Sequence, residues 1–99
     1  MSRKKVTVVA RIKARPGMEE LVRKELLALV APATSEKGCI SYDLHQAVDD
    51  KGLFLFYENW SSREALDEHL GKPYLQTLLA RAEVLFAEPV DLTLWEMIA

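Results

Sequence analysis

Hydrophobic and polar residues alternate along residues 5–15, which predicts a strand with one buried face. Its apolar side chains occupy every second position and are Val6, Val8, Ala10, Ile12 and Ala14. Pro16-Gly17 then turns the chain, and residues 18–30 place apolar side chains at helical spacing opposite charged ones. We therefore predict a strand followed by an amphipathic helix, with Pro32 marking the approximate end of that helix.

A strand pair is predicted next. The apolar residues Ile40, Tyr42, Leu44 and Val48 alternate with polar residues. The sequence Asp49-Asp50-Lys51-Gly52 is typical of a hairpin turn. Residues 53–57, LFLFY, are an unbroken apolar and aromatic run, which indicates a strand buried on both faces.

Two helices follow this strand. Ser61-Ser62-Arg63-Glu64 has capping-box spacing, so we expect Ser61 to cap a short helix, with Trp60 and Ala65 placed to form a hydrophobic staple. The apolar face of that helix includes His69. Gly71 and Pro73 interrupt it, and a second, longer apolar stripe runs from residue 74 to residue 86.

The final segment again alternates and predicts a fourth strand. Glu88-Pro89 ends the helix, and Leu92 and Leu94 fall on one strand face with Trp95 and Met97 on the other. The order βαββαβ predicts one α+β domain over residues 1–99, with a ferredoxin-like four-stranded antiparallel sheet and helices on one face. The uncovered face would be a large apolar patch, so we predict a homodimer in which two sheets pack face to face and close a barrel.

Composition and charge exclude several classes of protein. Thirteen basic and fifteen acidic residues give a net charge of −2, and the basic cluster Arg3-Lys4-Lys5 is short and terminal, so we expect no nucleic-acid binding. We expect no membrane span and no signal peptide, and therefore a cytoplasmic protein. The single cysteine, Cys39, has no partner for an internal disulfide and is predicted to be a small buried hydrophobe.

His69 is the leading candidate for chemistry. A histidine exchanges a proton near neutral pH, and at the edge of an apolar cavity it suits a general base for a phenolic hydroxyl. The alternative is a structural histidine whose ring bonds a backbone carbonyl or Tyr74. Tyr42 has two interpretations as well: a hydrogen-bond donor to a substrate oxygen, or a buried ring with a solvated hydroxyl.

Glu58 and Trp60 share one face of the third strand because they are two residues apart. They can orient His69 and form an aromatic wall. Alternatively, Glu58 pairs with Arg11 or Lys13 across the sheet, while Trp60 only packs against the helix.

Metal and nucleotide sites are not indicated. His45 and Asp43 share a strand face without a third ligand, and the four glycines do not form a phosphate-binding loop. We therefore expect no metal and no cofactor.

The chain resembles the antibiotic biosynthesis monooxygenase family of small dimeric α+β barrel proteins. The matching residues are Pro16-Gly17, Gly38-Cys39-Ile40-Ser41-Tyr42, Glu58 with Trp60, Ser62 with Ala65, His69 and Pro73. The resemblance implies a last strand that reaches across to the partner chain and cofactor-independent oxygenation of a quinol or polyphenol by dioxygen. It also implies that His69 lies beside the pocket. From the residues themselves, Tyr42 and Glu58 are the further catalytic candidates. The substrate-binding candidates are Trp60, Tyr74, Phe56 and Arg11.

Relatives of the same fold suggest one function that is not expected here, and two other functions stay open. Haem-degrading relatives carry an asparagine, a tryptophan and a haem-ligating histidine where this chain has Ala10, His69 and Leu79, so haem degradation is not expected. An isomerase of a small phosphorylated metabolite would need a pocket rich in cations such as Arg11, Lys13 or Arg81. A non-catalytic dimeric ligand-binding module is the third possibility.

Overall fold

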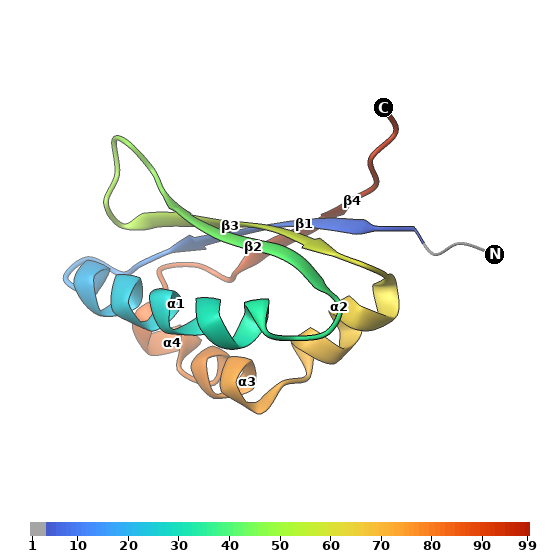
Figure 1. The fold of residues 1–99 in the computed structure, drawn as a ribbon. Coiled ribbons are helices and arrows are strands. Elements are labelled where there is room, and N and C mark those ends of the chain that lie inside the picture. Colours follow the sequence, from blue (N-terminus) through green and yellow to red (C-terminus); the bar gives the residue numbers. More distant parts are fainter. Residues whose placement is uncertain (1–3) are drawn as a thin grey trace.

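The computed structural model describes residues 4–99, which form a four-stranded antiparallel sheet with all helices on one face (Figure 1). The strands lie in the order β2-β3-β1-β4. The elements are β1 (Val6–Lys13), α1 (Glu19–Thr34), β2 (Cys39–Gln46), β3 (Leu53–Trp60), α2 (Arg63–Leu70), α3 (Pro73–Leu79), α4 (Ala82–Leu85) and β4 (Asp91–Trp95). The predicted ferredoxin-like α+β fold is confirmed.

Strand β1 is central, and its alternation sets the two faces of the sheet. Val8, Ala10 and Ile12 are buried beneath the helices, whereas Arg11 is exposed on the other face. Ala10 lies opposite Phe56 on β3 and opposite Leu92 on β4. Ala10, Phe56 and Leu92 therefore lie side by side across three strands, and all three line the space between the sheet and the helices.

Helix α1 is longer than predicted because Pro32 lies within it and does not end it. Hydroxyl side chains bond carbonyl groups of the last turn, where a helix leaves its carbonyls without backbone partners. The Thr34 hydroxyl donates to the Val30 carbonyl at 2.9 Å, and the Ser35 hydroxyl donates to the Pro32 carbonyl at 2.8 Å. Ala33 is fully buried, which anchors the final turn.

The cap of α2 is Ser62, not Ser61 as predicted. Its hydroxyl accepts from the Ala65 N–H at 3.1 Å. The Ser61 N–H, which a capping box would offer to Glu64, donates instead to the Gly38 carbonyl at 2.8 Å. Helix α2 therefore begins one residue later than the capping-box spacing suggested.

Two apolar residues of the second strand region lie outside the core, contrary to the predicted alternation. A register shift between Cys39 and Ser41 leaves Ile40 unmatched and 57% exposed. Val48 lies in the hairpin connection and is 97% exposed.

The predicted second helix is divided into α3 and the four-residue α4. Beyond α4 the chain becomes extended at Phe86, which bridges to Ala14 at the end of the first strand region. This return directs the chain back to the sheet, where β4 pairs with β1.

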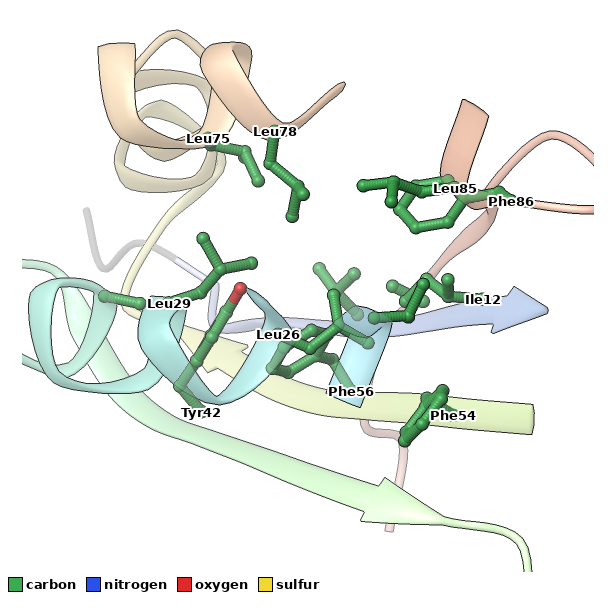
Figure 2. Packing of buried hydrophobic residues seen from close by; sticks show 14 of the residues in the cluster. Ile12, Leu26, Leu29, Tyr42, Phe54, Phe56, Leu75, Leu78, Leu85 and Phe86 are labelled. Carbon is green, nitrogen blue, oxygen red and sulfur yellow. The ribbon is translucent and has the colours of Figure 1, made fainter. Parts of the chain in front are cut away.

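The core lies between the sheet and the helices, and Figure 2 shows its side chains pointing toward one another from the two layers. Sheet residues such as Phe54 and Phe56 meet Leu26 from α1 and Leu78 from α3. Among the residues described, no helix is both long and apolar enough to cross a membrane. Of the basic terminal cluster, Lys4 pairs with Glu96 at 2.6 Å, and Arg3 lies outside the described residues.

Candidate functional site

An apolar cavity of about 160 Å³ lies between the sheet and the helical layer. Its walls are aliphatic and aromatic and include Ala10, Leu29, Phe56, Leu75, Leu78, Phe86 and Leu92. Only three of its lining residues carry polar side-chain atoms: Tyr42 from β2, Glu58 from β3 and His69 from α2. These are the three residues that the sequence indicated as catalytic candidates.

His69 is 2% exposed and is held on several sides. Its Nδ1 lies 2.8 Å from Oε2 of Glu36 and 3.3 Å from the Tyr74 hydroxyl. The Tyr74 hydroxyl also donates to the same Glu36 oxygen. The indole of Trp60 lies against the imidazole, with ring centroids 4.5 Å apart, and the Tyr42 ring meets it edge-on at 5.4 Å.

The polar atoms that lack protein partners point to the cavity. Among the residues described, every side-chain nitrogen or oxygen atom of a buried residue that solvent cannot reach has a hydrogen-bond partner. Nε2 of His69, the Tyr42 hydroxyl and Oε2 of Glu58 form no hydrogen bond within that part of the chain, so these buried residues must present the three atoms to open space. The space that all three line is the cavity. Figure 2 shows the Tyr42 oxygen pointing away from the sheet toward the helical layer.

The Glu58 carboxyl titrates near neutral pH. Burial raises the pKa of Glu58 from 4.5 to about 7, the hydrogen bond from Trp60 partly offsets this, and the nearby Glu36 charge adds to it. The Trp60 Nε1–H donates to Oε1 of Glu58 at 2.9 Å. Glu58 is therefore present in both protonation states at neutral pH.

Two tyrosines near the site, Tyr42 in the cavity wall and Tyr74 next to His69, keep their hydroxyl protons at neutral pH. Burial, aided by the Glu58 charge, raises the pKa of Tyr42 far above its ordinary value of 10.0. Burial and the hydrogen bond to Glu36 likewise raise the pKa of Tyr74. At neutral pH, Tyr42 can donate a hydrogen bond into the cavity, while Tyr74 donates to Glu36.

The structure brings most of the predicted site residues together, but in different roles. Phe56 lines the cavity, whereas Trp60 and Tyr74 contact His69 from outside the cavity lining. Arg11 is not brought to the site, because it lies on the opposite face of the sheet and pairs with Glu88 at 3.3 Å. The alternative in which Glu58 pairs with a strand-one cation is wrong, since its partner is Trp60.

Glu36 was missed by the sequence analysis, although it is the closest polar partner of His69. It lies in the connection between α1 and β2, where no periodic pattern relates it to a helix 33 residues later. The connection approaches α2 closely: a Cβ on Gly38 would lie 2.3 Å from the Cβ of Ala65. A glycine that permits such a close approach was the available indication that this connection packs against the helix.

The described residues contain no group of three His, Cys, Asp or Glu side chains arranged to hold a metal ion. His45 has its Nδ1 3.2 Å from the Asp43 carbonyl and lies outside the cavity lining. Cys39 is partly buried, and burial raises the pKa of its thiol to about 11, which keeps it protonated at neutral pH.

Comparison with known proteins gives consistent results. Residues 5–81 match the model of the family "Antibiotic biosynthesis monooxygenase". The Mycobacterium tuberculosis protein "Putative monooxygenase Rv0793" is 41% identical over 88 residues, which cover 89% of this chain and 86% of that protein. The structure of Rv0793 matches 96% of each chain with a TM-score of 0.89 and 36% identity.

Two further solved structures are similar. PA3566 from Pseudomonas aeruginosa is 34% identical, with a TM-score of 0.93 over 100% of this chain and 99% of its own. A crystal structure described as an antibiotic biosynthesis monooxygenase is 26% identical, with a TM-score of 0.88 over 95% of this chain and 99% of its own.

Proposed function

The chain belongs to the antibiotic biosynthesis monooxygenase family, and on this premise we propose that it is a cofactor-independent monooxygenase that oxidises a small quinol or polyphenol with dioxygen. One observation carries the proposal: the unpaired Nε2 of His69 and the Tyr42 hydroxyl open into the same apolar cavity. A proton acceptor and a proton donor therefore meet in a site that otherwise favours an aromatic ring.

The size of the cavity suits a substrate with one aromatic ring. Its volume is about 160 Å³, and an apolar protein cavity of roughly 150 Å³ binds benzene. Phe56 and the leucines of α1 and α3 offer apolar contact to such a ring, while the three polar atoms can contact its hydroxyl groups.

The chemistry asks the protein for a base, a donor and exclusion of water. His69 Nε2 accepts the proton of a phenolic hydroxyl, and the resulting phenolate is electron-rich enough to reduce dioxygen. The Tyr42 hydroxyl donates to the developing carbonyl oxygen. The apolar walls keep water from the reacting atoms.

The reaction balances without an external reductant. A quinol and dioxygen give a hydroxyquinone and water. One oxygen atom replaces a ring hydrogen and forms a C–O bond, the O–O bond breaks, and the second oxygen leaves as water with two protons. The substrate loses two electrons at the hydroxylated carbon and two in becoming the quinone, which together reduce both oxygen atoms.

The lining of this cavity does not favour an isomerase of a phosphorylated metabolite, which would need a cation-rich pocket. No arginine or lysine of residues 4–99 is among its lining residues. Lys13 pairs with Asp50 and Arg81 pairs with Glu25. The Glu58 carboxylate would also repel a phosphate group.

We also propose that the protein is a homodimer. The sheet face opposite the helices carries Tyr57 and Trp95, which are 41% and 58% exposed, and every residue of β4 is exposed. A second copy packed face to face would bury this apolar surface. The four residues after β4 would extend toward the partner.

Isotope labelling tests the proposed reaction. The protein is mixed with p-hydroquinones or naphthohydroquinones under ¹⁸O₂, alongside enzyme-free samples that measure spontaneous oxidation. We expect one labelled oxygen atom in each product molecule and no turnover under nitrogen. A product without label, or turnover that continues under nitrogen, would contradict an oxygenase and favour the isomerase.

A further inference from the structure

Among residues 4–99, the Nδ1 atom of His69 contacts two side-chain oxygen atoms and accepts no hydrogen bond. Oε2 of Glu36 lies at 2.8 Å, and the Tyr74 oxygen lies at 3.3 Å. A tyrosine hydroxyl has a single proton, and that of Tyr74 is donated to Glu36. The Tyr74 oxygen therefore presents lone pairs to the imidazole, as the Glu36 carboxylate does.

Two acceptors at one ring nitrogen determine where the proton of a neutral imidazole lies. A neutral histidine carries one N–H, and its second nitrogen is an acceptor. With Nδ1–H bonded to Glu36, the lone pair is on Nε2, and Nε2 is the atom that opens into the cavity.

We propose that Glu36 is a positioning residue that holds His69 in the Nδ1–H tautomer, so that Nε2 faces the substrate as a bare proton acceptor. The assignment of the tautomer rests on the contacts of Glu36, and its consequence for turnover rests on the proposed function. Glu36 does not line the cavity and so acts through His69.

The connection that carries Glu36 is itself held in place. Its side chain is 10% exposed. The Glu36 carbonyl accepts from the Cys39 N–H at 3.0 Å, and the Gly38 carbonyl accepts from the Ser61 N–H at 2.8 Å. Gly38 also packs directly against Ala65 on α2, the helix that carries His69. The carboxylate and the imidazole are therefore fixed relative to each other by backbone contacts as well as by their own hydrogen bond.

The expected effect of losing Glu36 follows from comparable systems. Removing the hydrogen-bond partner that orients a metal-ligating histidine typically costs about 10- to 100-fold in affinity or activity, and we expect a loss of that order for this base. With no carboxylate, both tautomers become populated, and the molecules with Nε2–H cannot accept the substrate proton. The loss should appear in kcat, with KM changed by less than about threefold, because the cavity walls are untouched.

Nitrogen-15 NMR of the histidine rings tests the tautomer directly. The chain has two histidines, so a His45→Asn variant assigns the spectrum. For neutral His69 in the wild type, we expect protonated Nδ1 and bare Nε2. Glu36→Leu, which removes the acceptor, should produce a measurable Nε2–H population and the loss of kcat. Glu36→Gln keeps an acceptor oxygen and should retain more of the Nδ1–H form and more activity.

Glu25→Gln is the matched control, because this α1 glutamate pairs with Arg81 on the surface at 3.0 Å. The variant should leave both the His69 tautomer and kcat unchanged. A wild-type spectrum dominated by Nε2–H would overturn the inference without any variant, as would an unchanged tautomer in Glu36→Leu. If the tautomer changes as expected but the wild type oxidises no quinol, the positioning role stands and the proposed function fails.

Discussion

Protonation of Glu58 links the stability of the fold to pH. Its pKa is raised by burial from 4.5 to about 7, so the folded protein holds a proton that the unfolded chain has lost. The stabilising contribution of this proton is complete below about pH 4.5 and is lost as pH rises through about 7. It amounts to about 3 kcal/mol of unfolding free energy, from the difference between the two pKa values.

Glu58→Gln should remove this part of the pH dependence. The amide keeps an acceptor oxygen for Trp60 Nε1 but carries no charge to bury. Urea unfolding at about pH 5 and about pH 8 should show that the variant loses about 2.5 kcal/mol less between the two conditions than the wild type, because part of the contribution is already lost at pH 5. Glu88→Gln, at an exposed glutamate paired with Arg11, is the control. Equal losses in wild type and Glu58→Gln would contradict the burial of this charge.

Individual residues were predicted well where periodicity determines them. The two-residue spacing of β3 placed Glu58 beside Trp60, and the helical spacing of α2 placed His69 on the buried side. The partner of His69 was not predictable, because Glu36 reaches it from a connection whose course depends on tertiary packing. Arg11 was also predicted to bind the substrate, but strand alternation places it on the far face of the sheet.

The connection between α1 and β2 is the element on which the candidate site depends most. It carries Glu36, and it approaches α2 at Gly38, where a Cβ would lie 2.3 Å from that of Ala65. Element boundaries were harder to predict than the elements themselves. Helix α1 continues past Pro32 to Thr34, and the Thr34 and Ser35 hydroxyls bond carbonyl groups of its last turn. A pattern of apolar positions does not reveal such side-chain contacts.

Gly38→Ala should therefore destabilise the protein and disturb the site together. We expect a loss of about 1–3 kcal/mol, as for other overpacked substitutions, measured by urea unfolding. Gly71→Ala is the matched control, since its nearest atom would be 3.7 Å from the new Cβ and its φ is −91°. Adding Ala65→Gly to Gly38→Ala should recover part of the loss beyond what Ala65→Gly costs alone. Additive losses in the double variant would contradict the contact.

At the scale of the whole molecule, one face of the sheet supports the helices and the cavity, and the other is left open (Figure 1). The βαββαβ order and the helical face were predictable because long periodic segments determine them. The open face prompted the prediction of a homodimer, which follows from exposed apolar residues such as Tyr57 and Trp95.

Sedimentation measurements test the dimer. We expect the wild type to have twice the chain mass of 11.2 kDa. Tyr57→Glu places a charge at the centre of the open face. This should raise the dissociation constant of the dimer by about tenfold or more and so favour the monomer. Val48→Glu, in the exposed hairpin, should not. A wild-type monomer, or a Tyr57→Glu variant that dimerises as tightly as the wild type, would contradict this interface.

Oxygen uptake with a panel of quinols tests the central claim most directly. His69→Ala removes the proposed base, whereas His45→Ala removes the other histidine, which lies outside the cavity lining. Removing a general base typically lowers turnover by about 10²- to 10⁴-fold. We therefore expect uptake well above the spontaneous rate in wild type and His45→Ala, and a fall of at least about 100-fold in folded His69→Ala. Wild-type uptake no faster than the spontaneous rate, or full activity in His69→Ala, would contradict the role proposed for this cavity.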